Sequence, residues 1–254
     1  MHPIRAFRLA LFALAIAAGL GIALLFPILS RALRARLRGA WSRALLWVLG
    51  VRIVLGGEAK SGAGACLVVS NHVSWLDAVA ISAAFADATF VCKDDVASWP
   101  LVGWLLGRAG TLFLRRGSAH AARRAACEMA GRLRAGARIA IFPEGTTTPG
   151  DAVLPFHAGL FEAAVQAGCA IQPVAIAYSN RAAVYAGGTG FGESLDAICG
   201  ARGLEVTLAL LPSFSGRGLE RREAARRARG GIVSCLGHRR VAEPSRGEPI
   251  LRAA

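Results

Sequence analysis

The segment CLVVSNHVSWLDA, residues 66–78, joins a short apolar run to the expected start of a helix. The valines in Cys66–Val69 favour a buried strand. Ser74 and Asp77 match the Ser-x-x-Asp capping box, in which the serine caps free amides and the aspartate reaches back. His72 lies five residues before Asp77 and permits a second interpretation, a catalytic pair of histidine and aspartate. The segment alone does not decide between the two.

Strand-like and helix-like segments alternate from residue 51 onward. Short β-rich runs are expected at 51–55, 66–69, 89–92, 111–114, 138–142, 171–178 and 205–211. Helices are expected after Ser74 and over 101–108, 118–134, 157–167 and 219–236, with a glycine-rich loop and at most one short helix over 180–203. The alternation predicts an α/β fold with a mixed, largely parallel sheet flanked by helices. We expect membrane-anchoring helices over 1–50, an α/β domain over 51–215, and a basic helix and tail over 216–254.

The composition is apolar and basic at the same time. Of the 254 residues 54% are hydrophobic, and the formal net charge of +14 is carried almost entirely by arginine. This favours an anionic partner, either nucleic acid or an acidic membrane surface. Zinc-ligand spacing and the signatures of basic zippers and RNA-binding domains are missing, so we expect a membrane bilayer and no nucleic acid. Six scattered cysteines are expected to be reduced core residues, which favours a domain facing the cytoplasm.

The first 50 residues carry the membrane signal. Leu9–Leu29 is a 21-residue run without a charge, close to the ~20 residues that cross a bilayer. A cleaved signal peptide, a spanning helix, and an embedded helix that enters and returns all fit this run. The larger arginine cluster follows it, so the positive-inside rule places the main domain on the cytoplasmic side of the inner (plasma) membrane. Residues 31–49 predict a second helix, whose arginines and tryptophans suit the headgroup layer.

Two further stretches place polar residues directly after apolar runs. IFPEGTTTPG, residues 141–150, puts Glu144 and Gly145 where a strand is expected to end, and such strand ends are common ligand sites in α/β proteins. An ordinary turn built by the prolines and glycines fits equally well. Lys93 ends one apolar run and Arg115–Arg116 end another. These cations suit a phosphate group, although they also fit ordinary surface charges.

Four blocks of the chain resemble the glycerolipid acyltransferase family, which includes the 1-acyl-glycerol-3-phosphate acyltransferases. The blocks are NHVSWLD, GTLFLRR, FPEGTTT and IQPVAI, and they stand in the family's order between residues 66 and 178. The resemblance implies an enzyme in which His72 and Asp77 are the catalytic pair. It also implies that the acceptor is bound by residues of these blocks and of the sequence between them: Asn71, Ser74, Lys93, Arg115, Arg116, Glu144, Gly145 and Thr146.

The spacing of His72 and Asp77 restricts where they can lie. Five positions apart on one regular helix, two side chains point about 140° away from each other and do not meet. They can meet if His72 lies in the loop before the helix and Asp77 in its first turn. His72 would then be a general base toward an acceptor hydroxyl, with Asp77 holding its tautomer. We expect no serine or cysteine nucleophile, no metal and no cofactor.

The expected reaction moves an acyl chain from acyl-CoA or acyl carrier protein to the sn-2 hydroxyl of 1-acyl-glycerol-3-phosphate, giving phosphatidic acid. Two departures from the family's blocks bear on this acceptor. Thr147 stands where arginine is common, and His157 where lysine is common. The loss of two cations makes another lysolipid, such as lyso-ornithine lipid, an alternative acceptor. A non-catalytic, membrane-anchored lipid-binding protein is the alternative of another class, and the intact His72, Asp77 and Glu144 disfavour it.

Overall fold

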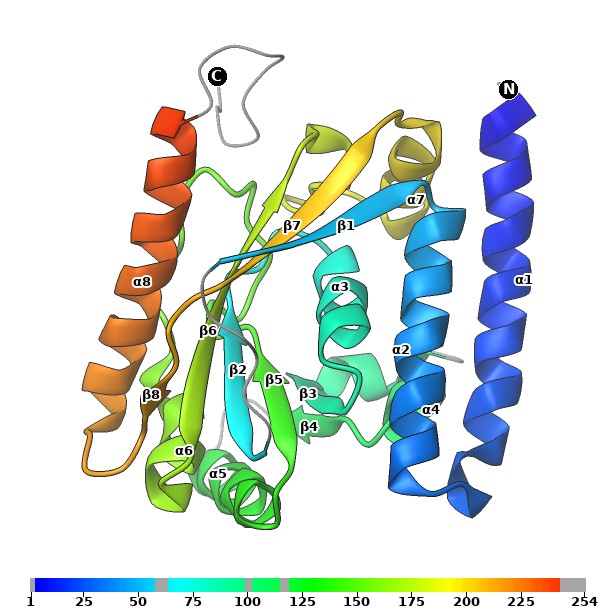
Figure 1. The fold of residues 1–254 in the computed structure, drawn as a ribbon. Helices are drawn as coiled ribbons and strands as arrows, with labels where there is room; N and C mark the ends of the chain where they lie inside the picture. The colour runs from blue at the N-terminus through cyan, green and yellow to red at the C-terminus, as the bar shows by residue number, and fades with distance from the viewer. Residues whose placement is uncertain (1–2, 58–63, 99–101, 115–118, 243–254) are drawn as a thin grey trace.

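A computed structural model describes residues 3–57, 64–98, 102–114 and 119–242 of the chain. Its strands form one eight-stranded sheet with helices on both faces (Figure 1). The sheet is mixed and mostly parallel, so the predicted fold class is confirmed.

The sheet has β2 near its centre, between β5 and β6. The strands are β1 (Val51–Gly56), β2 (Cys66–Ser70), β3 (Ala88–Lys93), β4 (Leu112–Leu114), β5 (Arg138–Ile141), β6 (Ala170–Tyr178), β7 (Leu204–Leu210) and β8 (Phe214–Ser215). Their order is β1-β7-β6-β2-β5-β3-β4, with β8 paired to β6. All pairs are parallel except β6 with β7 and β6 with β8.

The helices fall close to the predicted segments. They are α1 (Pro3–Leu25), α2 (Arg31–Val48), α3 (Leu76–Ala84), α4 (Val102–Arg108), α5 (Ala119–Arg134), α6 (Glu162–Ala167), α7 (Phe191–Gly200) and α8 (Arg221–Ala242). Short 3-10 helices occupy Phe26–Ile28, Asp94–Ser98, Ala158–Phe161 and Arg181–Ala183. α7 is the short helix expected within the glycine-rich segment, whereas β8 and the 3-10 helix after β3 were not predicted.

Alternate residues of β2 point to opposite helix layers. Cys66 and Val68 join the apolar core formed with α2 and α3, whereas Leu67 and Val69 join the core formed with α5, α6 and α8. Because both faces are covered, every residue of β2 is buried. This explains why its sequence is a continuous apolar run and not an alternating one.

Helices α1 and α2 form an antiparallel hairpin on the side of the molecule away from α8 (Figure 1). They approach closely at Gly19, where an added Cβ atom would lie 2.7 Å from Nε1 of Trp41. The Trp41 indole therefore lies against α1 and donates a hydrogen bond to the Ala15 carbonyl at 2.7 Å. In the described part of the chain, Pro3–Ile28 is the one helix long and apolar enough to cross a membrane, by length and composition alone.

The N-terminal end of α1 is bound to the α/β domain. Arg5 forms an ion pair with Asp196 of α7. Nη1 of Arg8 donates to the carbonyls of Cys199 and Ala201, at 3.0 and 2.8 Å. Since α2 returns from the hairpin turn to β1, both ends of the hairpin lie at the same end of the domain (Figure 1).

Candidate active site

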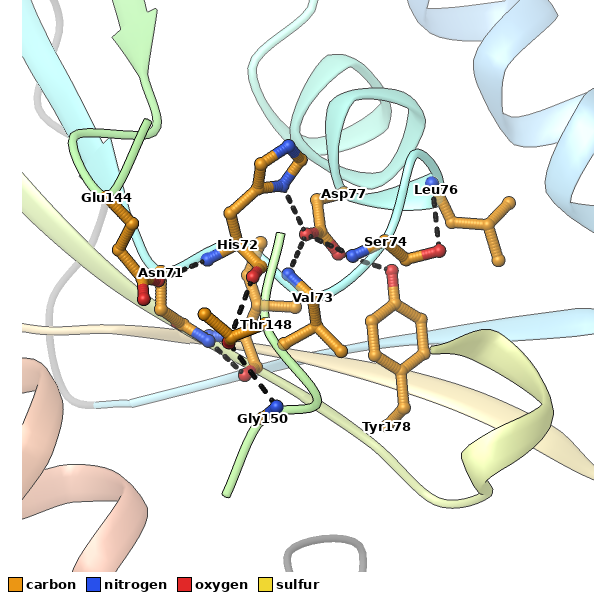
Figure 2. Close-up of polar contacts among 11 residues, drawn as sticks. Asn71, His72, Val73, Ser74, Leu76, Asp77, Glu144, Thr148, Gly150 and Tyr178 are labelled. Carbon is orange, nitrogen blue, oxygen red and sulfur yellow. Dashed lines mark hydrogen bonds and ion pairs between the residues drawn. The ribbon is translucent and has the colours of Figure 1, made fainter. Parts of the chain in front are cut away.

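The loop between β2 and α3 brings His72 and Asp77 together. β2 ends at Ser70 and α3 begins at Leu76, so His72 lies in the loop and Asp77 in the first helical turn. Nδ1 of His72 is 2.8 Å from Oδ2 of Asp77 (Figure 2). This is the arrangement that the five-residue spacing requires. An ionised carboxylate can only accept, so this contact suits the neutral tautomer with the proton on Nδ1. In that tautomer the lone pair is on Nε2, on the side of the ring away from Asp77 (Figure 2).

The Asp77 side chain is fully buried and accepts hydrogen bonds on both oxygens. Besides His72, Oδ2 accepts the backbone amides of Val73 and Ser74, at 2.7 and 2.9 Å. Oδ1 accepts the hydroxyl of Tyr178 at 2.6 Å. These four donors offset the cost of burying a carboxylate and hold it in one orientation.

The same aspartate also helps to start α3, so the capping and the catalytic interpretations are compatible. Its bond to the Ser74 amide is the aspartate half of a capping box. The serine half differs from the motif, because the Ser74 hydroxyl accepts from the amide of Leu76 at 3.3 Å and Trp75 is the N-cap. Ser74 is buried, and its contact with a substrate stays a prediction.

The imidazole of His72 is also held on its flat side. Phe142, directly after β5, stacks against it with ring centroids 4.2 Å apart and 13° between the ring planes. The His72 side chain is still 21% exposed, so a substrate can reach it. Asp77 therefore fixes the edge of the ring and Phe142 its face.

Glu144 ties the loop after β5 to the loop after β2. Its Oε1 accepts the backbone amide of His72 at 2.7 Å, and its Oε2 accepts that of Leu154 at 2.8 Å. Burial raises the pKa of Glu144, while these two backbone hydrogen bonds act in the opposite direction. Both oxygens contact protein backbone, which is the geometry of a positioning residue. A direct contact between Glu144 and the acceptor stays a prediction.

Two more side chains fix the backbone around His72. Asn71 pairs with Ile176 of β6: its Nδ2 donates to the carbonyl at 3.0 Å, and its Oδ1 accepts the amide at 2.8 Å. The amide and the hydroxyl of Thr148 both donate to the His72 carbonyl, at 2.9 and 3.3 Å. The His72 residue is thus held at its amide by Glu144 and at its carbonyl by Thr148 (Figure 2).

The other predicted residues of the FPEGTTT block lie in the same loop after β5 as Glu144 and Thr148. Gly145 has a φ of 71°, in the left-handed region that favours glycine, and its amide donates to the Phe142 carbonyl at 3.1 Å. Thr146 is exposed, and so is His157. Their contact with the acceptor, like that of Gly145, stays a prediction.

The predicted cations cannot be placed as side chains. Arg115, Arg116 and the side chain of Lys93 lie outside the described residues. The backbone of Lys93 pairs with Leu114, the last residue of the parallel neighbour β4. Lys93 and the residue that precedes the two arginines in sequence are therefore neighbours across two strands.

Tyr178 and Thr148 contact the candidate pair directly and were missed in the sequence. Tyr178 is the last residue of β6, so its place at a strand end was an available signal, whereas the position of β6 beside β2 comes only from the structure. Thr148 is the third of three threonines, and no sequence signal separates it from Thr146.

Known proteins resemble this chain in sequence and in fold. Residues 52–177 match the family model described as Acyltransferase. A lyso-ornithine lipid O-acyltransferase of Pseudomonas aeruginosa is 39% identical over 210 residues, 80% of each chain. A 1-acyl-sn-glycerol-3-phosphate acyltransferase of Neisseria meningitidis is 37% identical over 142 residues, 55% of this chain and 54% of that protein. The crystal structure of the Thermotoga maritima 1-acyl-sn-glycerophosphate acyltransferase matches with a TM-score of 0.69 at 22% identity, covering 96% of this chain and 97% of that one.

The α/β sheet with a histidine–aspartate pair at the end of its central strand, together with these matches, defines an acyltransferase. The chain belongs to the acyltransferase family, and the resemblance carried by its four sequence blocks is confirmed. It is an enzyme of lipid metabolism that transfers an acyl chain from an acyl donor to a lysolipid acceptor.

Proposed function

We propose that the enzyme transfers an acyl chain from an acyl thioester to the sn-2 hydroxyl of 1-acyl-glycerol-3-phosphate, giving phosphatidic acid. The observation that carries the proposal is the 2.8 Å contact between His72 Nδ1 and Asp77 Oδ2, with Nε2 on the opposite side of an accessible ring. A base oriented in this way suits proton removal from a hydroxyl.

In the proposed reaction, the acceptor hydroxyl gives its proton to Nε2 of His72 as its oxygen bonds to the thioester carbonyl carbon. Asp77 stabilises the imidazolium that forms. The tetrahedral intermediate then collapses, the carbon–sulfur bond breaks, and the departing thiolate takes the proton from His72. The products are the acylated lipid and a free thiol, coenzyme A or acyl carrier protein, and no acyl-enzyme forms.

The remaining site residues divide into two proposed roles. Asn71, Ser74 and Glu144 keep the His72 loop in place, because their polar atoms contact backbone groups of that loop and its neighbours. The acceptor headgroup is bound near Gly145 and Thr146, and its phosphate is bound by the three cations predicted from the sequence: Lys93, Arg115 and Arg116.

Lyso-ornithine lipid is the second candidate acceptor, and a specific observation favours it. The relative from Pseudomonas aeruginosa that is named for this acceptor matches over 80% of both chains, further than the Neisseria meningitidis relative named for the glycerol phosphate acceptor. Thr147 and His157 point the same way, because each stands where the family commonly has a cation.

The acceptor is tested with Arg116→Ala, assayed with lysophosphatidate and with lyso-ornithine lipid. A charge-assisted hydrogen bond to phosphate contributes roughly 1.5–3 kcal/mol, so the apparent KM for lysophosphatidate should rise at least about tenfold. Arg124→Ala removes an exposed arginine of α5 and should leave both acceptors unaffected. The proposal of a phosphate-bearing acceptor is wrong if the enzyme uses lyso-ornithine lipid alone, or if Arg116→Ala leaves the use of lysophosphatidate unchanged.

We also propose that the α1–α2 hairpin enters one leaflet and returns, which leaves the N-terminus and the catalytic domain together on the cytoplasmic side. Arg5 and Arg8 support this topology because they bind α7 of the domain. Phe7, Leu14 and Leu24 of α1 are exposed, and such a row of large apolar side chains needs a nonpolar environment.

A further inference from the structure

Tyr178 is buried in the core, and its hydroxyl meets the candidate catalytic aspartate. Along β6, Val174, Ile176 and Tyr178 face the core formed with α3, whereas Ala175 and Ala177 face the opposite layer. The pleat of the strand therefore directs Tyr178 toward α3, where Asp77 lies in the first turn.

The two oxygens of Asp77 have different partners. In the described part of the chain, the hydrogen bonds from His72, Val73 and Ser74 all go to Oδ2. Oδ1 accepts from the Tyr178 hydroxyl at 2.6 Å. Without this hydroxyl, Oδ1 would be a buried carboxylate oxygen that has lost its donor, and the carboxylate could rotate about its Cβ–Cγ bond.

The Tyr178 hydroxyl is also a permanent donor. Burial raises the pKa of Tyr178 well above its ordinary value, and the charge of Asp77 and the hydrogen bond to it raise it further, against a smaller opposite effect of Ser74. The phenol therefore stays protonated at every pH at which the enzyme is active, and it donates its proton to Oδ1.

We infer that Tyr178 is a positioning residue for acyl transfer: it fixes the Asp77 carboxylate so that Oδ2 holds His72 in line with the acceptor hydroxyl. This inference rests on the proposed function. Tyr178 acts through Asp77 and does not touch the substrate. Its removal should therefore lower kcat and leave the KM for the acceptor almost unchanged.

The test is a double-mutant cycle on the full chain in detergent. Tyr178→Phe keeps the ring and removes the hydroxyl, and we expect kcat to fall about tenfold with KM within about twofold. In an Asp77→Asn background the same change should cost less than about twofold, because its partner has already been altered. Thr207→Val is the matched control, since it removes one buried hydroxyl from the neighbouring strand β7 opposite Ala177. It should leave kcat unchanged.

Two results would overturn the inference: wild-type kcat in Tyr178→Phe, or losses that multiply in the double variant. A second measurement covers a Tyr178→Phe protein that does not fold, and it needs no activity. The chain has two tyrosines, so fluorotyrosine incorporated in a Tyr185→Phe background reports on position 178 alone. Its fluorine resonance should move in Asp77→Asn and stay in Thr207→Val, and an unmoved resonance contradicts the contact. Wild-type protein that transfers no acyl chain contradicts the proposed function instead.

Discussion

At the scale of single residues, the His72 backbone is held at both polar ends by side chains of the loop after β5. Glu144→Gln tests this frame, because the amide nitrogen that replaces one oxygen would face a backbone N–H. An unpaired buried donor costs about 1–3 kcal/mol, so the free energy of unfolding should fall by that amount in denaturant titrations. We expect kcat to fall about 10–100-fold, since small shifts of a catalytic group are costly.

Glu162→Gln is the control for this substitution. Glu162 lies on α6 and pairs with Arg221 at 3.3 Å, both partly exposed, so its loss should change stability by less than about 1 kcal/mol. A Glu144→Gln protein of normal stability and kcat, with only a raised KM for the acceptor, would show instead that Glu144 binds the acceptor directly.

The sequence predicted the contact between His72 and Asp77, but not the side chains that hold the two residues in place. His72 and Asp77 could be paired because a five-residue spacing across a strand-to-helix loop has few solutions. Tyr178 could not be chosen in the same way, because its bond to Asp77 joins residues 101 positions apart and depends on the strand order. The role of Glu144 was expected from resemblance as contact with the acceptor, whereas the structure occupies both its oxygens with backbone amides.

At the scale of elements, the α1–α2 hairpin is the part of the chain that we propose to enter the membrane. Tags at the two chain ends test its topology, with protease added to inverted and to right-side-out membrane vesicles. A hairpin that returns predicts that both tags are cleaved in inverted vesicles and that both are protected in right-side-out vesicles. A spanning α1 predicts opposite results for the two tags and would contradict the proposed topology.

The helices and strands themselves were largely predictable from the sequence. The contacts between the α1–α2 hairpin and the α/β domain were not. Periodicity and turn residues located α2 within one residue at its end, but α8 ends at Ala242, six residues beyond its predicted end at Leu236. The contact between Arg5 and Asp196, which supports the proposed return of the hairpin, joins residues 191 positions apart, and no local pattern contains it. β8 is two residues long, too short for a pattern.

At the scale of the whole molecule, large exposed apolar side chains lie on α1, whereas exposed arginines lie both on α2, at 31 and 36, and on α8. The hairpin covers one side, and α8, with exposed arginines at 222 and 226, lies across the sheet from it (Figure 1). The six cysteines are not joined in disulfides, and burial raises the pKa of Cys92 and Cys169 to about 11. Cys127 is exposed, so the expectation that every cysteine is a core residue was wrong for this position.

The most direct test of the account uses purified full-length protein in detergent, a labelled acyl thioester, and lysophosphatidate or lyso-ornithine lipid. Wild-type protein should form the labelled, fully acylated lipid from at least one acceptor. His72→Ala should lower the rate by about 10²–10⁴-fold, the usual contribution of a general base, while its melting temperature and membrane binding stay normal. Transfer by His72→Ala at close to the wild-type rate would contradict the account.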